Sequence, residues 1–285
     1  MAQGDVTLGS LEDIPADLWE ECSACHQLLY SREFEAALWV CSKCGYHKRL
    51  TVEQRLATVA DEGSVQELFA DLPLADPLRF PEYHEKLEQA RQKTGMDEAV
   101  WTGLVSIGGH RVGMGIMDLA FIGGSMGWVV GEKVTLLIER CVEERRGVVM
   151  FCASGGARMQ ESLVALMQMP KTCAAVGQMN QARLPYITVL TDPTYGGVTA
   201  SFAFLGDVIL AEKGAAMGFA GPRVIQITKM KIAPEVQTAE FQYEHGMIDL
   251  LVGREQVRDT LVDLLEWLVP HPVDRQSSGS GVSVG

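Results

Sequence analysis

Four cysteines near the N-terminus have the residue type and spacing of a metal site. Cys22 and Cys25 form one Cys-x-x-Cys pair and Cys41 and Cys44 form a second, with fifteen residues between the pairs. Two such pairs present four thiolates to a single tetrahedral zinc ion. Because four thiolates leave no open ligand position, and so short a segment cannot build a core alone, we expect the zinc to be structural.

The residues around the two pairs bear on what this zinc ribbon does. The spacer between the pairs is expected to form a short hairpin. A redox dithiol normally has one Cys-x-x-Cys at a strand-to-helix turn, so two pairs argue against that role. Residues 19–50 contain four acids and four Lys or Arg, with Lys43, Lys48 and Arg49 near the second pair. This modest basic group favours a structural or docking module, and nucleic-acid contact stays open as the alternative.

Two glycine pairs follow apolar runs and open helical patterns. Gly155 and Gly156 form the first pair, and Gly196 and Gly197 form the second. Glycines at the start of a helix leave backbone N–H groups uncovered, which suits an anion or a developing oxyanion. Neither run is a phosphate loop or a dinucleotide fingerprint. The alternative is that both pairs only make tight turns.

Conventional catalytic side chains are harder to find. No His-Glu-x-x-His motif and no spaced carboxylate pair stands out, and a nucleophile elbow is not expected. Asp192 precedes Pro193, which favours a turn role, and His110 and His245 are interpreted as structural. Backbone amides are then the remaining candidates for a catalytic role. They fit chemistry whose main demand is to hold an enolate oxygen while the base comes from elsewhere.

The elements that must position these groups alternate between strands and helices. A strand, a glycine turn and a helix occur twice, with the glycine pairs 41 residues apart. Such repetition predicts an α/β fold of stacked ββα layers. We expect a hairpin over 100–118, strands at 148–152, 186–190 and 247–252, and helices at 131–146, 158–180, 198–205 and 254–268.

The chain is expected to divide into five parts. They are a flexible lead at 1–17, the ribbon at 18–50, a helical linker at 51–97 with helices over about 52–70 and 81–95, the main domain at 98–269, and a disordered tail at 270–285.

Composition narrows the class of protein. The net charge of −13 over 285 residues argues against a general nucleic-acid binder. The longest apolar runs have strand length, so no membrane span is expected, and the acidic N-terminus is not a signal peptide. Seven cysteines, three of them outside the ribbon, favour a reducing compartment, either the cytosol or an organelle stroma reached after removal of a targeting peptide.

From residue 19 to residue 268 the chain resembles the β subunits of bacterial-type acetyl-CoA carboxylase carboxyltransferase, a form also found in plastids. The resemblance covers about 250 of 285 residues and combines the ribbon with both glycine motifs. It is carried by WVCSKCGYHKRL (39–50), SGGARMQESLVALMQMPKT (154–172), LPYITVLTDPTYGGVTASFAFLGD (184–207), GFAGPRVIQIT (218–228) and TAEFQYEHGMIDLLV (238–252).

The resemblance implies a crotonase-like superfold and a specific reaction. Carboxylate passes from carboxybiotin to acetyl-CoA and gives malonyl-CoA for fatty-acid synthesis. It also implies a carboxyltransferase α subunit in an α2β2 heterotetramer, a biotin carboxyl carrier protein and a biotin carboxylase. Biotin would come on the carrier, because Lys229 and Lys231 lack the usual attachment context. The alternatives are a biotin-dependent acyl-CoA decarboxylase subunit and a zinc-ribbon regulator that binds nucleic acid.

Site residues follow from matching positions. The amides of Gly196 and Gly197 are the first choice for the oxyanion hole of the thioester enolate. Gly155 and Gly156 are the second choice and would line the acyl-CoA pocket. Arg158 and Arg223 would orient CoA phosphates or form salt bridges, and both roles stay open. Two features depart from the family pattern, namely Pro170, expected to kink its helix, and the segment 234–237.

Overall fold

The computed structural model describes residues 18–73, 76–229 and 231–269. The expected lead 1–17 and tail 270–285 lie outside the described residues, and the division into five parts stays a prediction. The strands are β1 Trp19–Glu21, β2 Leu28–Tyr30, β3 Gln66–Glu67, β4 Val100–Ile107, β5 His110–Met117, β6 Val148–Ser154, β7 Tyr186–Tyr195, β8 Val208–Glu212, β9 Met217–Gly218 and β10 Leu250–Val252.

Helices surround these strands. The α-helices are α1 Ser31–Ala36, α2 Val52–Val59, α3 Tyr83–Thr94, α4 Trp128–Glu143, α5 Ser162–Ala182, α6 Gly196–Thr199, α7 Pro222–Thr228, α8 Ala239–Glu244 and α9 Arg254–Leu268. Short 3-10 turns lie at Ile122–Gly124, Met159–Glu161, Phe202–Phe204 and Pro234–Gln237. None of the described helices is long and apolar enough to cross a membrane.

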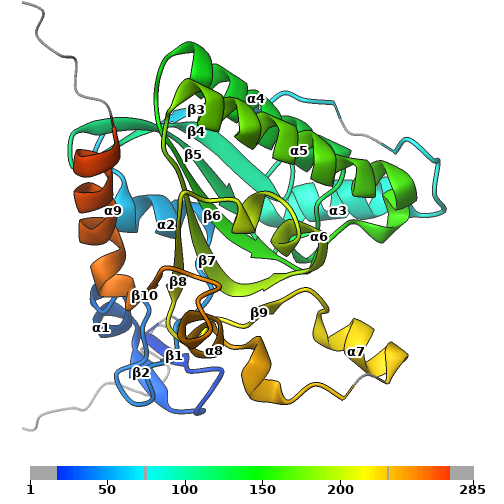
Figure 1. Ribbon diagram of the computed structural model, residues 1–285. Helices are drawn as coiled ribbons and strands as arrows, with labels where there is room; N and C mark the ends of the chain where they lie inside the picture. The colour runs from blue at the N-terminus through cyan, green and yellow to red at the C-terminus, as the bar shows by residue number, and fades with distance from the viewer. Residues whose placement is uncertain (1–17, 74–75, 230, 270–285) are drawn as a thin grey trace, which may run out of the picture.

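An eight-stranded sheet forms the centre of the main domain (Figure 1). Its order is β10-β8-β7-β6-β5-β4-β3, and β9 leaves this path to pair with β7. The β3, β4 and β5 strands are antiparallel neighbours, whereas β5, β6, β7, β8 and β10 run parallel. Because parallel neighbours end at the same edge of a sheet, the glycine turns after β6 and β7 come side by side.

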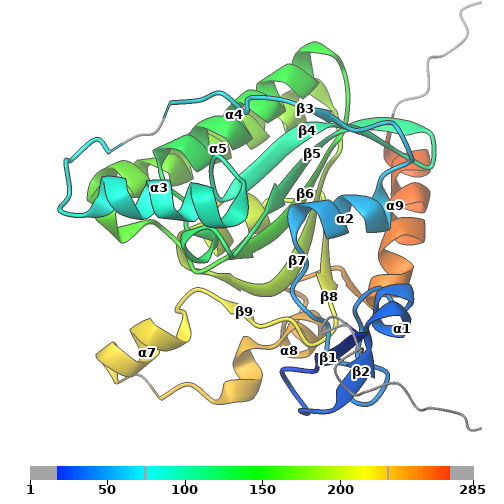
Figure 2. The same ribbon diagram turned by 180° about the vertical axis from the view of Figure 1, so that it is seen from behind.

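Two hydrophobic cores cover the two faces of the sheet. The α3, α4 and α5 helices pack on one face, and α2 and α9 on the other (Figures 1 and 2). In β6, Met150 and Cys152 point into the first core while Val149 and Phe151 point into the second. The strand is buried on both faces, which explains its continuous apolar run.

Most predicted elements of the main domain are confirmed. The hairpin turns at Gly108 and Gly109 between β4 and β5, and the two strand–glycine–helix units are β6 with α5 and β7 with α6. Their strands share one continuous sheet. The β7 strand runs beyond the predicted range 186–190 to Tyr195, the residue directly before the second glycine pair. The α5 helix continues through Pro170.

Three predicted segments differ from the structure. The helix expected over 198–205 is replaced by the short helix α6, Gly196–Thr199, and a 3-10 turn at Phe202–Phe204. The helix expected over 52–70 ends at Val59, because Asp61 turns away to accept hydrogen bonds from the amides of Gly108 and Gly109. In the ribbon, the spacer forms β2 and α1 rather than a hairpin. The hairpin instead spans the first cysteine pair, where β1 pairs with β2.

Candidate active site and metal centre

The two glycine turns touch each other at the carboxyl ends of β6 and β7. Gly156 and Gly196 both have positive φ, at 115° and 63°. A Cβ atom built on Gly196 would lie 3.0 Å from the Cα of Gly156, which is tighter than nine in ten real Cβ contacts. A side chain at Gly196 would therefore require the two turns to shift by a few tenths of an ångström. Glycine is therefore required by both backbone conformation and close approach.

The amides of the two turns are used differently. Gly155 N donates to the carbonyl of Gly123 at 2.9 Å, and Gly156 N donates to Oγ of Ser154 at 3.0 Å. Both amides of the first pair thus have partners within the protein. Gly197 lies in the first turn of α6, where amides have no acceptor within the helix. The geometry favours Gly197 over the first pair as a donor to a ligand.

A third glycine turn lies against the first. Gly123 and Gly124 follow β5 as the other pairs follow β6 and β7, and Ser154 Oγ donates to the carbonyl of Gly124 at 2.6 Å. A Cβ atom on Gly124 would lie 2.3 Å from the carbonyl oxygen of Ala153. Sequence analysis did not identify this turn. The signal was present, since it too has a glycine pair between a strand and a helix.

The same segment also matches the letters Gly-x-Ser-x-Gly, a match that sequence analysis passed over, at Gly123 to Gly127. Its central residue, Ser125, accepts a hydrogen bond from Nε of Arg158 at 2.9 Å and donates to the carbonyl of Ile122 at 2.8 Å. The hydroxyl is therefore held between an arginine and a carbonyl. Such a group orders the loop and is not placed as an activated nucleophile.

Arg158 is buried beside the first glycine turn. Its guanidinium makes a two-pronged ion pair with Glu98 at 2.6 and 2.8 Å, and Nη1 also donates to the hydroxyl of Tyr83. Burial opposes its charge, but the Glu98 carboxylate outweighs burial and raises the pKa of Arg158. This geometry favours the salt-bridge role over contact with CoA phosphates. Arg223 lies in the first turn of α7, and its side chain is outside the described part of the structure.

The four ribbon cysteines converge on one point. All four Sγ atoms lie within 4.8 Å of one another, and the Cys22–Cys44 and Cys25–Cys41 sulfur pairs are each 3.8 Å apart. Four thiolates around zinc at about 2.3 Å would be about 3.8 Å apart in a tetrahedron, so the donor set fits that ion. Burial raises the pKa of Cys41, but the backbone amides of Lys43 and Cys44 outweigh it and lower the pKa to about 7.

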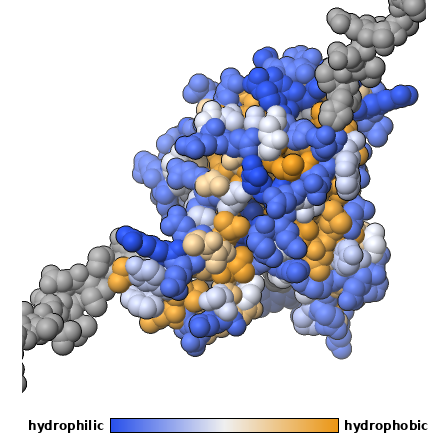
Figure 3. All heavy atoms as spheres, turned by 90° about the vertical axis from the view of Figure 1, so that its left-hand side faces the viewer, coloured by the Kyte–Doolittle hydropathy of each residue, from blue (hydrophilic) through white to orange (hydrophobic). Residues whose placement is uncertain are grey.

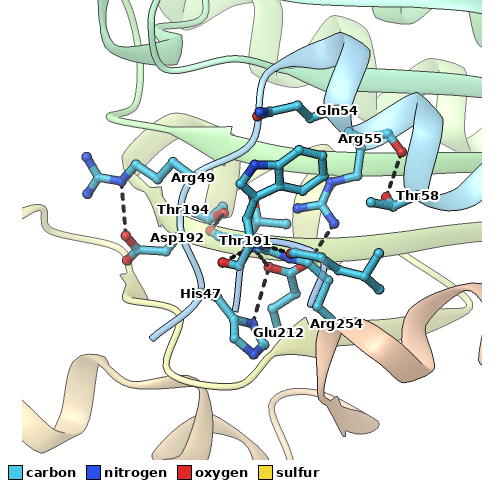
Figure 4. A network of polar contacts seen from close by, with 12 residues as sticks. His47, Arg49, Gln54, Arg55, Thr58, Thr191, Asp192, Thr194, Glu212 and Arg254 are labelled. Atoms are coloured by element: carbon cyan, nitrogen blue, oxygen red, sulfur yellow. Dashed lines mark hydrogen bonds and ion pairs between the residues drawn. The ribbon is translucent and has the colours of Figure 1, made fainter. Parts of the chain in front are cut away.

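The ribbon is joined to the main domain by a buried charge network around Glu212, the last residue of β8 (Figure 4). Arg55 Nη1 donates to Oε1 of Glu212 at 2.6 Å, and Arg254 Nη2 donates to Oε2 at 2.6 Å. Arg254 also donates to the ribbon carbonyl of Leu38 at 3.1 Å. Burial raises the pKa of Glu212, but Arg55, His47 and Arg254 together outweigh burial and hold the pKa well below its usual range.

A cavity of about 430 Å³ lies between the ribbon and the ends of the strands. Tyr46 and His47 line it from the ribbon, and Asp192, Glu212 and Lys213 line it from the main domain. Its size is within the range of small-molecule sites, and it borders the edge of the sheet where parallel strands end. The ribbon therefore forms one wall of a hollow next to the strand that leads to Gly196.

Comparison with known proteins identifies the family of this chain. Residues 70–277 match the carboxyl transferase domain family. The acetyl-coenzyme A carboxylase carboxyl transferase subunit beta of Desulforamulus reducens is 52% identical over 254 residues, which are 89% of this chain and 88% of that protein. The corresponding subunit of Carboxydothermus hydrogenoformans is 48% identical over 257 residues, 90% of this chain and 92% of that protein.

Solved structures share the fold at lower identity. The Pseudomonas malonate decarboxylase MdcD-MdcE hetero-dimer superposes with a TM-score of 0.61 and 23% identity, over 78% of this chain and 88% of that chain. The transcarboxylase 12S structure superposes with a TM-score of 0.65 and 24% identity, over 82% of this chain and 42% of that chain. The predicted crotonase-like fold with an N-terminal four-cysteine ribbon is thereby confirmed.

Identity of about half over nine-tenths of the chain, together with the matching domain, is far above the level that defines a family. The chain therefore belongs to the carboxyl transferase family, in the group of acetyl-CoA carboxylase carboxyl transferase β subunits.

Proposed function

We propose that this chain binds acetyl-CoA and directs the transfer of carboxylate from carboxybiotin, held on a separate carrier protein, to give malonyl-CoA for fatty-acid synthesis. The observation that carries the proposal is the close contact of the two glycine turns at the edge of the sheet, in a chain of this family. The site of this reaction would be a bacterial cytoplasm or a plastid stroma, and the bacterial relatives support the former.

The backbone would act on the thioester oxygen. When acetyl-CoA loses a methyl proton, charge develops on its carbonyl oxygen, and preorganised N–H donors stabilise that charge. The amide of Gly197, with that of Gly196, would point to this oxygen. Gly155 and Gly156 would shape the wall of the acyl pocket, since their amides already have protein partners. Carboxybiotin supplies the carbon dioxide and the base, so the chain needs no side-chain base of its own.

Zinc would bind to Cys22, Cys25, Cys41 and Cys44 and take no part in the chemistry. The four sulfurs, which lie within 4.8 Å of one another, would fill a tetrahedral shell and leave no position for substrate. The ion would hold together a ribbon whose core contains few buried apolar residues. Removing the ion would therefore unfold the ribbon before it affects the rest of the chain.

The partner in the α2β2 assembly would bind the exposed apolar side of α5. Leu163, Leu166 and Met167 are between 47% and 63% exposed, and their spacing places them on one face of α5. Met159, in the 3-10 turn before α5, is 81% exposed. Phe219 beside α7 is also exposed. Such a row on a long helix next to the active-site loops supports an interface with the α subunit. Biotin carboxylase and the carrier protein would join through that complex.

The assay combines the purified chain, its α subunit, carboxybiotin and acetyl-CoA, and measures malonyl-CoA. Gly197→Pro removes the amide donor at a helix position where proline is tolerated. We expect it to lower turnover about a hundred- to a thousandfold, or about 3 kcal/mol.

Gly197→Ala is the matched control. It keeps the amide, and its Cβ atom would lie 3.3 Å from Ala157 Cβ and from the flexible Met169 side chain. It should retain far more turnover than the proline variant. Equal turnover of Gly197→Pro and Gly197→Ala would remove Gly197 from the oxyanion site. Absence of malonyl-CoA with the wild-type chain would reject the function, and release of carbon dioxide from malonyl-CoA alone would favour a decarboxylase.

A further inference from the structure

We propose that Arg49 is a positioning residue for the acyl site, acting through Asp192 on the end of β7. Arg49 lies in the segment that leaves the ribbon toward α2, and its Nε donates to Oδ2 of Asp192 at 3.1 Å (Figure 4). The two residues are 143 positions apart in the sequence. This contact therefore ties the ribbon to the strand that ends at the second glycine turn. The inference rests on the proposed function.

Asp192 is held on both carboxylate oxygens. Its Oδ1 accepts from the amide of Ala216 at 3.0 Å, and Arg49 binds Oδ2. Ala216 in turn accepts at its carbonyl from the amide of Thr194 at 2.9 Å. Asp192 and Thr194 are thus both joined to Ala216, the residue before β9. The last residues of β7 are fixed between the ribbon and the start of β9.

The glycine turn follows at once. Thr194 pairs with Met217 and Tyr195 pairs with Gly218 in the short β7–β9 ladder, and Gly196 is the next residue. The direction of the Gly197 amide depends on how this end of β7 is held. Misplacing a donor by about 1 Å can cost two orders of magnitude in rate. A residue that fixes Asp192 can therefore affect catalysis without touching the substrate.

Arg49 is well suited to a test because it is not needed to dock the ribbon. Its side chain is 56% exposed and that of Asp192 is 19% exposed, and such pairs contribute little to stability. The ribbon has a separate, buried attachment through Arg254, which binds Glu212 and the carbonyl of Leu38. Loss of Arg49 should leave the fold and the ribbon in place and free only one oxygen of Asp192.

Charge adds a second consequence of the same contact. Asp192 lines the cavity of about 430 Å³ together with Glu212 and Glu240. Without Arg49 its carboxylate would lose its ion-pair partner beside a site that must accept anionic substrates. The guanidinium fixes the carboxylate in place and balances its charge. A lysine at position 49 would balance the charge but could not reproduce the planar fork of arginine.

The experiment compares Arg49→Gln, Arg49→Lys and Lys48→Gln in the complete complex. Lys48 is the matched control because it forms an ion pair with Glu20 within the ribbon. We expect Arg49→Gln to lower kcat for malonyl-CoA formation about tenfold or more, with KM for acetyl-CoA changed less than about twofold. Arg49→Lys should recover part of the loss, and Lys48→Gln should match the wild type. The melting temperature should shift by no more than about 2 °C.

A second readout does not depend on activity. Hydrogen exchange of the peptide that covers residues 190–200 should be faster in Arg49→Gln than in the wild type and unchanged in Lys48→Gln. Metal content per chain should be equal in all variants. If Arg49→Gln keeps the wild-type kcat, or if exchange at 190–200 is unchanged, the positioning role is overturned. If the wild-type complex makes no malonyl-CoA, the proposed function fails, and the exchange result alone decides the role of Arg49.

Discussion

Glu212 is the charge on which the junction of ribbon and main domain depends. Its side chain is 2% exposed, and its oxygens bind Arg55 and Arg254, while Nδ1 of His47 lies 3.6 Å away (Figure 4). Two buried guanidinium groups share this single carboxylate. Removing one member of a buried ion pair leaves the others uncompensated, which costs far more than the pair itself contributes.

Replacing Glu212 by Gln should therefore destabilise the chain by about 3–5 kcal/mol, measured by urea denaturation at pH 7. Glu62→Gln is the control, since Glu62 is exposed on the turn after α2 and should change stability little. The folded pKa of Glu212 is depressed because Arg55, His47 and Arg254 together outweigh burial. Its contribution is thus complete above the unfolded pKa of about 4.3 and is lost as pH falls through the lower folded value. The gap between wild type and variant should narrow below pH 4, and a gap that widens there would contradict this assignment.

At the residue scale, what could be predicted was local in sequence. The cysteine pairs and the glycine pairs could each be recognised from a few neighbouring positions. The Glu212 network could not be found this way, because Arg55 and Glu212 are 157 residues apart and meet only through the sheet topology. Arg158 shows the same limit. Its motif is local, but its partner Glu98 is 60 residues away.

Among the elements, α5 is a long helix with a row of exposed apolar side chains. Its inner face packs on α4 and the sheet, whereas Leu163, Leu166 and Met167 face outward. On the side of the molecule that carries α9 and the ribbon, hydrophobic side chains occur in separate patches between hydrophilic ones (Figure 3). A continuous apolar row on one helix is therefore the stronger indication of a partner.

The substitution Leu163→Glu should weaken binding of the α subunit by about ten- to a hundredfold, because a buried leucine contributes roughly 1.5–3 kcal/mol. The melting temperature of the isolated chain should not fall, since the side chain is already exposed. Titration calorimetry with the purified α subunit measures the affinity. Gln178→Glu, at an exposed position of the same helix, provides the control for charge. Equal affinities of the two variants would place the interface elsewhere.

Element types were predicted better than element ends. Apolar periodicity identified the strands and helices of the main domain, because both faces of its sheet are covered. The helix predicted over 52–70 was too long because Asp61 leaves the helix to accept a hydrogen bond from the amide of Gly108, 47 residues away. The ribbon spacer was predicted to be a hairpin, but part of it forms the helix α1, and Phe34 on this helix is buried in the ribbon core. Metal-bound segments are specified by their cysteines, so their apolar residues follow no regular period.

In the whole molecule, the main domain and the ribbon differ greatly in the size of their hydrophobic cores. The main domain has an extensive hydrophobic core on each face of its sheet. The ribbon core contains Cys22, Leu29, Phe34 and Cys41, so two of its four buried apolar residues are the cysteines themselves. A core of this size cannot balance the conformational entropy of an ordered segment. A metal ion bound by the four cysteines would supply the difference.

Removal of the metal should therefore unfold the ribbon and leave the main domain folded. The purified chain should contain about one zinc ion. After treatment with a chelator, amide exchange should become fast at residues 18–50 while α4 and α5 keep their protection, and readdition of zinc should reverse the change.

Cys25→Ser is the genetic counterpart of chelation, and Cys173→Ser, at a cysteine on α5 outside the ribbon, is its control. Unfolding of the ribbon also removes the carbonyl acceptor of Arg254 and the contact of Arg49 with Asp192. Exchange should then rise at the end of β7 as well, to a smaller extent. Slow exchange throughout residues 18–50 in the metal-free chain would show that the ribbon folds without zinc. The link from the metal centre to the glycine turn would then lose its basis.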